Sequence, residues 1–235
     1  MTIPRMKQAL WKVRTPSRPS TGPEWMSYSF LAEAEKCPRA AFLKYSDYEE
    51  LWDKPGYPQR PNAAAVAGSV VHSAAEWILK QLIADGVSST RSTAAAQSMR
   101  SLGGFSAVLS SAFEKAVEKE AANPRFTDFE PTLRKQIEAR MPRMRESLQE
   151  ILADRQLLAS PDSVAAASPP RRGDPQRRSL SPGTHFEVDL RDTVVMWKGR
   201  VDMLTISEEG CSIYDIKTGQ PDDSHRLQLQ IYVLL

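Results

Sequence analysis

Residues 199–219, GRVDMLTISEEGCSIYDIKTG, have the pattern of a β-hairpin that carries acidic residues and a lysine. Apolar and polar residues alternate through residues 200–204 and again through residues 212–217, which is typical of two strands. Residues 208–210, Glu-Glu-Gly, lie between these runs and predict the turn. The stretch therefore predicts two adjacent antiparallel strands.

The hairpin carries the residues with the clearest chemical meaning. Successive side chains of a strand point to opposite faces, so Asp215 and Lys217 are expected on one face, about 6.6 Å apart along the strand. With Asp202 on the partner strand, two carboxylates and an ammonium converge, which is the composition of a metal-dependent phosphodiesterase site. Taken alone, however, an Asp-x-Lys triplet is also compatible with an exposed ion pair that contributes little.

Two segments before the hairpin add candidate site residues. Residues 62–85 are rich in alanine with apolar residues at helical spacing, and Gly86 follows as a C-cap. His72 lies inside this predicted helix, four residues after Gly68. Glu187 lies in a strand-like run at residues 185–190.

The last segment, residues 224–235, is predicted to be a helix. His225, Gln228 and Tyr232 are spaced so that they share one face of it, which would border the site. In the alternative, the packing face is an apolar stripe made of Leu227, Ile231 and Leu234.

Together these segments resemble the PD-(D/E)XK nuclease superfamily, and within it the RecB-like branch. The resemblance extends over about residues 27–235 and rests on the order and spacing of four motifs. The motifs are Gly68 with His72, Gly199 with Asp202, Asp215 through Gly219, and His225 through Tyr232. Residues 28–31 and 37–45 are similar to the segment that opens such domains.

The resemblance implies a role for each residue. Asp202, Asp215, the backbone carbonyl of Ile216 and His72 are expected to hold Mg²⁺ or Mn²⁺. Carboxylates and phosphate oxygens suit a hard cation, and a bound cation lowers the pKa of its water and stabilises charge on the phosphate. Lys217 would orient that water or neutralise the developing charge. The expected supporting residues are Glu187, Gln228 and Tyr232.

The two cysteines separate this chain from relatives that carry an iron–sulfur cluster, because such a cluster needs four thiolates. Cys37 and Cys211 cannot assemble one, so no iron–sulfur cluster is assigned, and we expect Cys37 to be a small buried residue. We also expect the domain to be incomplete at its C-terminus. Two cysteines in no framework fit a reducing cytoplasm.

Composition predicts appendages around one domain. Residues 1–26 form a predicted basic flexible arm, and residues 159–184, rich in proline and arginine, a disordered linker. Residues 107–158 are predicted to be a helical insertion, with a kink or break at Pro142. No run of residues is apolar enough to suggest a membrane span.

The predicted fold is α/β: a restriction-endonuclease-like core with a mixed central β-sheet flanked by helices, and the helical insertion. The resemblance implies a metal-dependent deoxyribonuclease, more specifically an exonuclease in recombination, repair or CRISPR adaptation, with DNA and a helicase or other recombination or CRISPR protein as partners. One alternative is a non-cleaving DNA-binding module of the same fold that serves a helicase. Another is a metal-dependent hydrolase of small phosphate esters, which would have no use for the basic arm and linker.

Overall fold

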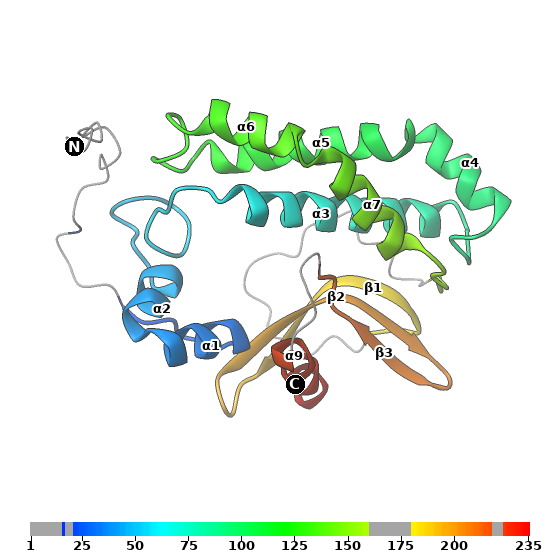
Figure 1. Ribbon diagram of the computed structural model, residues 1–235. Helices are drawn as coiled ribbons and strands as arrows, with labels where there is room; N and C mark the ends of the chain where they lie inside the picture. Colours follow the sequence, from blue (N-terminus) through cyan, green and yellow to red (C-terminus); the bar gives the residue numbers. More distant parts are fainter. Residues whose placement is uncertain (1–15, 17–20, 160–179, 218–222) are drawn as a thin grey trace.

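A computed structural model describes residue 16 and residues 21–159, 180–217 and 223–235. These residues form a layer of helices on one face of a small β-sheet, a single helix on its other face, and two short helices beside one end of the sheet (Figure 1). The helices are α1 (Tyr28–Lys36), α2 (Pro38–Tyr45), α3 (Ala63–Ala84), α4 (Thr93–Ser101), α5 (Gly104–Glu120), α6 (Glu130–Glu138), α7 (Met141–Leu152) and α9 (Asp223–Leu234). The strands are β1 (Gly183–Asp192), β2 (Trp197–Ser207) and β3 (Gly210–Tyr214).

Helix α3 confirms the predicted helix at residues 62–85 and is the central element of the helical layer. The side chain of Asn62 caps its start by accepting hydrogen bonds from the backbone N–H groups of Ala64 and Ala65. At its end Gly86 adopts a φ of +73°, and the N–H of Val87 donates to the carbonyl of Leu82. This is a Schellman arrangement, in which glycine avoids the steric cost of the left-handed conformation.

The other helices of this layer pack on α3 through apolar side chains. Leu109 of α5, Leu133 of α6 and Leu148 of α7 are buried in one cluster with Ile78 of α3. The predicted break near Pro142 is confirmed, because α6 ends at Glu138 and α7 starts at Met141 with the proline in its first turn. Helices α1, α2 and α4 were not expected.

The sheet corrects one expectation. Its three described strands are antiparallel in the order β1-β2-β3, whereas a mixed sheet was expected. Parallel pairing among the described residues is limited to a bridge between Met26 and Trp197. Met26 therefore belongs to the folded part, although it was expected at the end of the flexible arm.

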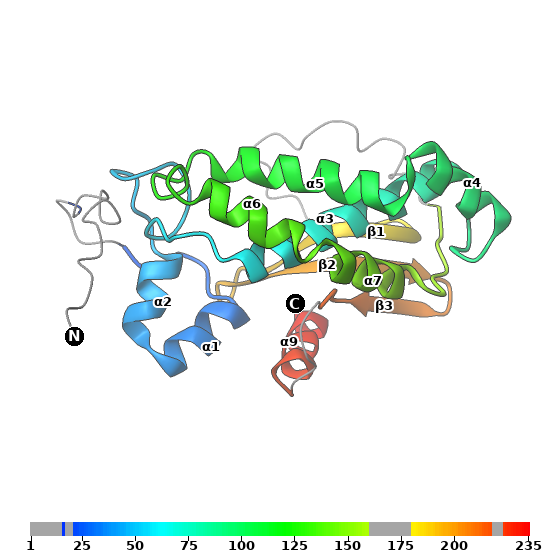
Figure 2. The same cartoon turned by 45° about the horizontal axis from the view of Figure 1, so that its top comes forward.

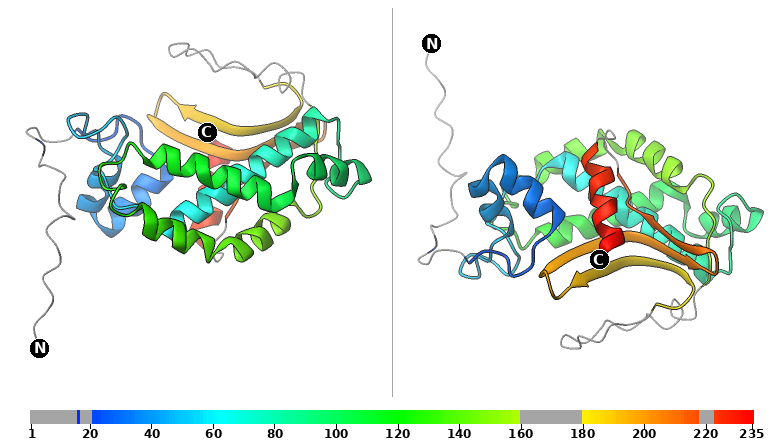
Figure 3. Two further views of the ribbon diagram at one scale, coloured as in Figure 1. Left: turned by 90° about the horizontal axis from the view of Figure 1, so that it is seen from above. Right: turned by 90° about the horizontal axis from the view of Figure 1, so that it is seen from below.

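Each face of the sheet is covered by a different layer. Met203 of β2 packs into the cluster around α3, together with Phe186 of β1. Val201 and Leu204 pack instead with Tyr232 of α9. Figures 2 and 3 show α3 and α7 over one face of the sheet and α9 across the other. The sheet is thus held between helices, and polar residues at the α3 face lie in the seam between two layers.

The expectations for the linker, the arm and Cys37 can also be compared with the described residues. Most of the expected linker and arm lies outside the described residues, but Gly183 and Thr184 are the first residues of β1 and not linker. Cys37 is exposed, because it is the N-cap of α2 at a corner between two short helices, so the expectation of a buried residue was wrong. Among the described helices, none combines the length and apolar character needed to cross a membrane.

Candidate metal centre

The hairpin brings Asp202 and Asp215 together where β3 ends. The last pair of the β2–β3 ladder is Met203 with Tyr214, so Asp202 and Asp215 are the next two opposed residues. The ladder stops there because the N–H of Ile216 donates to the carboxylate of Asp202 over 2.5 Å. Asp215, Ile216 and Lys217 therefore follow the strand instead of belonging to it, which corrects the predicted strand end.

His72 reaches this point from α3 and contacts acids on two strands. Its Nε2 lies 2.6 Å from Oε1 of Glu187 on β1, and its Nδ1 lies 3.5 Å from Oδ2 of Asp202 on β2. The three side chains are between 14% and 28% exposed, so the cluster is partly closed to water but open on one side. Residues that are 115 positions apart in the chain are thus joined by one short hydrogen bond.

The charges in this cluster affect one another. The hydrogen bond to Glu187 raises the pKa of His72, and the Asp202 carboxylate acts in the same direction while burial opposes both. The same hydrogen bond lowers the pKa of Glu187. Burial raises the pKa of Asp202, and the neighbouring carboxylates of Asp215 and Glu187 add to that effect. The cluster therefore favours a positive charge between its acids.

Asp215 is a nearly buried carboxylate beside Lys217. Its side chain is only 6% exposed, and its Oδ2 has no hydrogen bond from any described residue. The Nζ of Lys217 lies 2.6 Å from that oxygen as an ion pair, but it approaches outside hydrogen-bond geometry. Buried carboxylates are costly unless they are paired or hold a metal, so the donor set around Asp202 and Asp215 fits a divalent cation.

Glu187 is held in an unusual backbone conformation. Its φ is +52°, and no ladder pair forms between Glu187 and Asp202, although pairs form on either side of them. As a result two consecutive residues point to the same layer: Glu187 bonds to His72 while Phe186 packs into the α3 cluster. Such strain costs about 1–3 kcal/mol and is concentrated at functional sites.

One group of potential ligand atoms matches the expected ligand set only in part, because it contains the expected ligand His72 together with two glutamates. Among the described residues, one oxygen or nitrogen each of His72, Glu76 and Glu187 lies within 4.8 Å of the others. Asp202 is outside this group, although its carboxylate lies 3.5 Å from His72. Asp215 is also outside the group. Glu76 was missed, although its position one helical turn after His72 places both residues on one face of α3.

Helix α9 packs on the sheet through its polar candidates. Gln228 and Tyr232 are each 8% exposed, and the amide of Gln228 donates a hydrogen bond to the hydroxyl of Tyr232. His225 is half-buried. The alternative with an apolar packing stripe is wrong, because Leu227 is 50% and Leu234 82% exposed.

Gly199 explains why a tyrosine fits on this face of the sheet. A Cβ atom at position 199 would lie 2.6 Å from Cε1 of Tyr232 and 3.2 Å from Cδ1 of Leu235. The absent side chain therefore leaves the space that the Tyr232 ring fills. The pKa of the Tyr232 hydroxyl is raised mainly by burial. The charges of Asp215, Lys217 and Asp202 also act on this hydroxyl, so the ring borders the acidic cluster.

Replacing Gly199 by alanine is expected to lower the free energy of unfolding by about 1–3 kcal/mol, the usual cost of overpacking. The added methyl group clashes with the Tyr232 ring, which is only 8% exposed, so the ring or α9 must shift. Urea denaturation of both proteins measures the difference. Tyr232→Ala removes the clashing ring, so Gly199→Ala should cost much less in that background. An equal cost in both backgrounds would show that the ring does not set the requirement for glycine.

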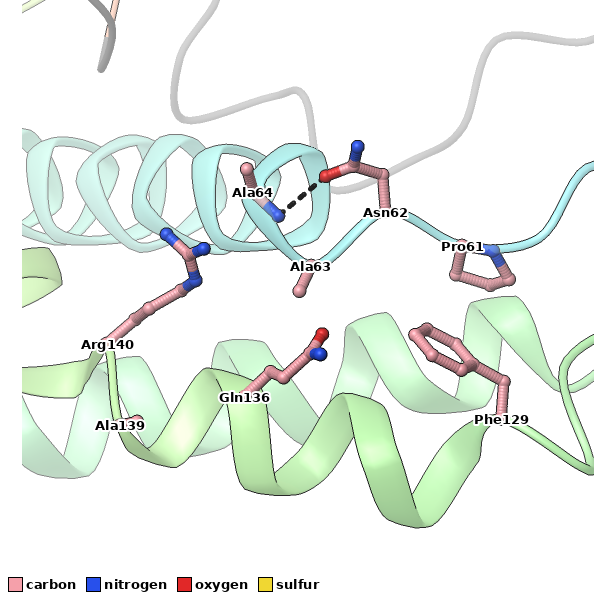
Figure 4. A pocket seen from close by; sticks show the side chains of 8 residues that line it. All are labelled: Pro61, Asn62, Ala63, Ala64, Phe129, Gln136, Ala139 and Arg140. Carbon is pink, nitrogen blue, oxygen red and sulfur yellow. Dashed lines mark hydrogen bonds between the residues drawn. The ribbon is translucent and has the colours of Figure 1, made fainter. Parts of the chain in front are cut away.

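One hollow lies away from these residues. It has a volume of about 520 Å³ and lies at the start of α3, where Asn62, Phe129, Gln136 and Arg140 line it (Figure 4). None of the acidic residues described above borders it. The candidate centre is thus separate from this hollow and is a partly exposed cluster of charged side chains at a layer seam.

Comparison with known families gives one match. A model of the PD-(D/E)XK nuclease superfamily matches residues 25–235. Comparisons with curated proteins and with solved structures find no match.

Proposed function

The chain belongs to the PD-(D/E)XK nuclease superfamily, and we propose from this membership that it is a Mg²⁺- or Mn²⁺-dependent deoxyribonuclease of the RecB-like branch. The superfamily implies a metal-dependent nuclease. The observation that supports a centre in this chain is the contact of His72 with Glu187 at 2.6 Å and with Asp202 at 3.5 Å. Helix α3 and strands β1 and β2 thus bring one imidazole and two carboxylates into one cluster, which supports the proposal of a metal centre.

In this proposal Asp202, Asp215, His72 and the carbonyl of Ile216 hold the ion. The ion, once bound, activates a water molecule and stabilises the negative charge that builds on the phosphate. Lys217 follows Asp215 by two positions, is 37% exposed and is available to orient that water or the phosphate. Glu187 positions His72 through their hydrogen bond, and Gln228 with Tyr232 supports the hairpin from the opposite face.

The substrate and partners are also proposals. We infer an exonuclease that acts on DNA ends or single strands in recombination, repair or CRISPR adaptation, working in the cytoplasm with a helicase or a CRISPR protein. The RecB-like motif order supports this assignment. The layout proposed with it is an N-terminal basic arm that ends before Met26, and one nuclease domain with a helical insertion, residues 107–158, and a linker that ends before Gly183. The alternative is a DNA-binding module that does not cut.

The His72→Ala variant tests the metal centre. Imidazole suits transition ions better than Mg²⁺, so Mn²⁺-supported cleavage of linear DNA should fall more than Mg²⁺-supported cleavage, by about 10-fold or more. Release of labelled nucleotides with each ion, and with a chelator as the blank, measures the ratio.

His185 provides the matched control, because it lies on the same strand as Glu187 and its Nε2 lies 2.8 Å from the backbone carbonyl of Ser181. His185→Ala should keep the parental ratio of Mn²⁺- to Mg²⁺-supported rates. No cleavage of DNA by the parental protein with either ion would favour the binding module instead.

A further inference from the structure

Arg200 of β2 lies at the edge of the acidic cluster, and the proposed metal centre gives it no role. Its Nη1 donates to Oε2 of Glu187 over 3.3 Å, while the other oxygen of Glu187 lies 2.6 Å from Nε2 of His72. One carboxylate thus separates the guanidinium group from the histidine. The side chain of Arg200 is 60% exposed, so it borders the cluster on the side that is open to water.

Asp189 holds this guanidinium group in one orientation. The register of the sheet pairs Asp189 directly with Arg200, and the Nε of Arg200 donates to Oδ1 of Asp189 over 2.9 Å. A guanidinium group carries five N–H donors in a planar fork. Among the described residues, the two carboxylates accept from Nε and Nη1, and none accepts from Nη2. Arg200 therefore presents a charged donor that is fixed in direction and exposed.

We propose that Arg200 contacts a phosphate group of the DNA strand that lies over the proposed metal centre. The inference rests on the proposed function, because it names a substrate contact of the same centre. Arginine suits this role, since its planar fork can donate two hydrogen bonds to one phosphate. The Nη2 group can donate to a phosphate without breaking the bonds to Asp189 and Glu187, so the contact needs no rearrangement.

The charges around Asp202 explain why a cation is needed at this place. A phosphate is an anion, and the carboxylates of Asp202, Asp215 and Glu187 repel it. Lys217 follows β3, on one side of β2, whereas Arg200 contacts Glu187 of β1, on the other side. A DNA strand that crosses the sheet at Asp202 would therefore meet one cation on each side of the proposed metal ligand.

DNA binding as a function of salt concentration tests the proposal. A fluorescent single-stranded oligonucleotide is titrated with the full chain in the presence of a chelator, so that no cleavage occurs. Arg200→Ala should weaken binding by about 10-fold or more and lower the slope of log K against log salt by about one, because one phosphate contact is lost. Arg200→Lys keeps the charge and should keep the slope, but it should bind more weakly than the parental protein because it lacks the fork.

Lys198→Ala is the matched control. Lys198 is an exposed cation two residues before Arg200, so both side chains lie on the same face of β2. The control should bind DNA with the parental affinity and the parental slope. An equal fall of the slope in both variants would overturn the proposal, since it would indicate a diffuse basic surface instead of a contact at Arg200.

Steady-state cleavage with Mn²⁺ separates a substrate contact from a structural role. Arg200→Ala should raise KM by about 10-fold and change kcat by no more than a few-fold, because the contact is made in the ground state and in the transition state alike. Its Mn²⁺ affinity, measured by calorimetry, should equal the parental value. A fall in Mn²⁺ affinity and kcat with an unchanged KM would show that Arg200 only holds Glu187 in place, and the proposal would be wrong.

The outcomes also separate the phosphate contact from the nuclease assignment. Parental cleavage together with an unchanged KM and salt slope in Arg200→Ala would refute the contact and leave the nuclease centre standing. DNA binding that depends on Arg200, without cleavage by the parental protein, would support the contact and favour the binding module that does not cut. A parental protein that neither binds nor cleaves DNA would refute both.

Discussion

Replacing Asp202 by asparagine is expected to reduce metal-dependent DNA cleavage by at least about 10³-fold, or roughly 4 kcal/mol of transition-state stabilisation. The substitution removes a proposed ligand charge but keeps an oxygen that can accept the hydrogen bond from Ile216. DNA binding should be unchanged or stronger, since a repulsive charge is lost. Initial cleavage rates and DNA binding in a gel-shift assay measure the two effects.

The stability of the same variant distinguishes a functional acid from a structural one. Burial raises the pKa of Asp202, so the folded protein disfavours the ionised form relative to the unfolded chain. Near neutral pH the uncharged asparagine should therefore leave the melting temperature unchanged or raise it. Glu208→Gln, at the exposed turn of the same hairpin, serves as the control and should change neither property. Parental activity in Asp202→Asn would refute the site assignment.

Replacing Lys217 by alanine is expected to lower the cleavage rate by about 10²-fold or more, while Mn²⁺ affinity stays within a few-fold of the parental value. The physical reason is that an ammonium group placed beside the phosphate stabilises charge that appears only in the transition state. Single-turnover rates at saturating Mn²⁺ measure the first quantity, and calorimetry measures the second.

Lys198→Ala is a suitable control, because Lys198 is an exposed lysine on β2 that the site assignment does not use. It should keep the parental rate. A loss of Mn²⁺ affinity in Lys217→Ala that matches its loss of rate would move Lys217 from a catalytic to a structural role, in which its ion pair with Asp215 holds the ligand in place.

The elements with a regular pattern could be predicted from the sequence. The helix at residues 62–85 has a capping asparagine at one end and a glycine at the other, so residues next to each end predict where the helix begins and ends. The hairpin was found for the same reason, since alternation and a turn signal need only neighbouring residues. His72 could be placed beside the hairpin only through the family resemblance, because 115 positions separate it from Glu187.

Features that depend on distant packing could not be predicted in this way. The burial of Gln228 and Tyr232 requires the space that Gly199 leaves on another element, and no local pattern encodes that match. The strand end before Asp215 depends on a hydrogen bond from Ile216 to a side chain on the partner strand. A sequence pattern assumes a regular ladder, and the site forms where the ladder is irregular.

The proposed metal ligands lie on elements that are far apart in the chain, so they are synthesised at different times. Ribosomes release a chain from its N-terminus, so His72 and Glu76 emerge long before Glu187 and Asp202. A nascent chain that has completed only α1 to α7 contains His72 but neither Glu187 nor Asp202. The proposed centre is therefore completed only when the strands, which are synthesised later, dock on α3.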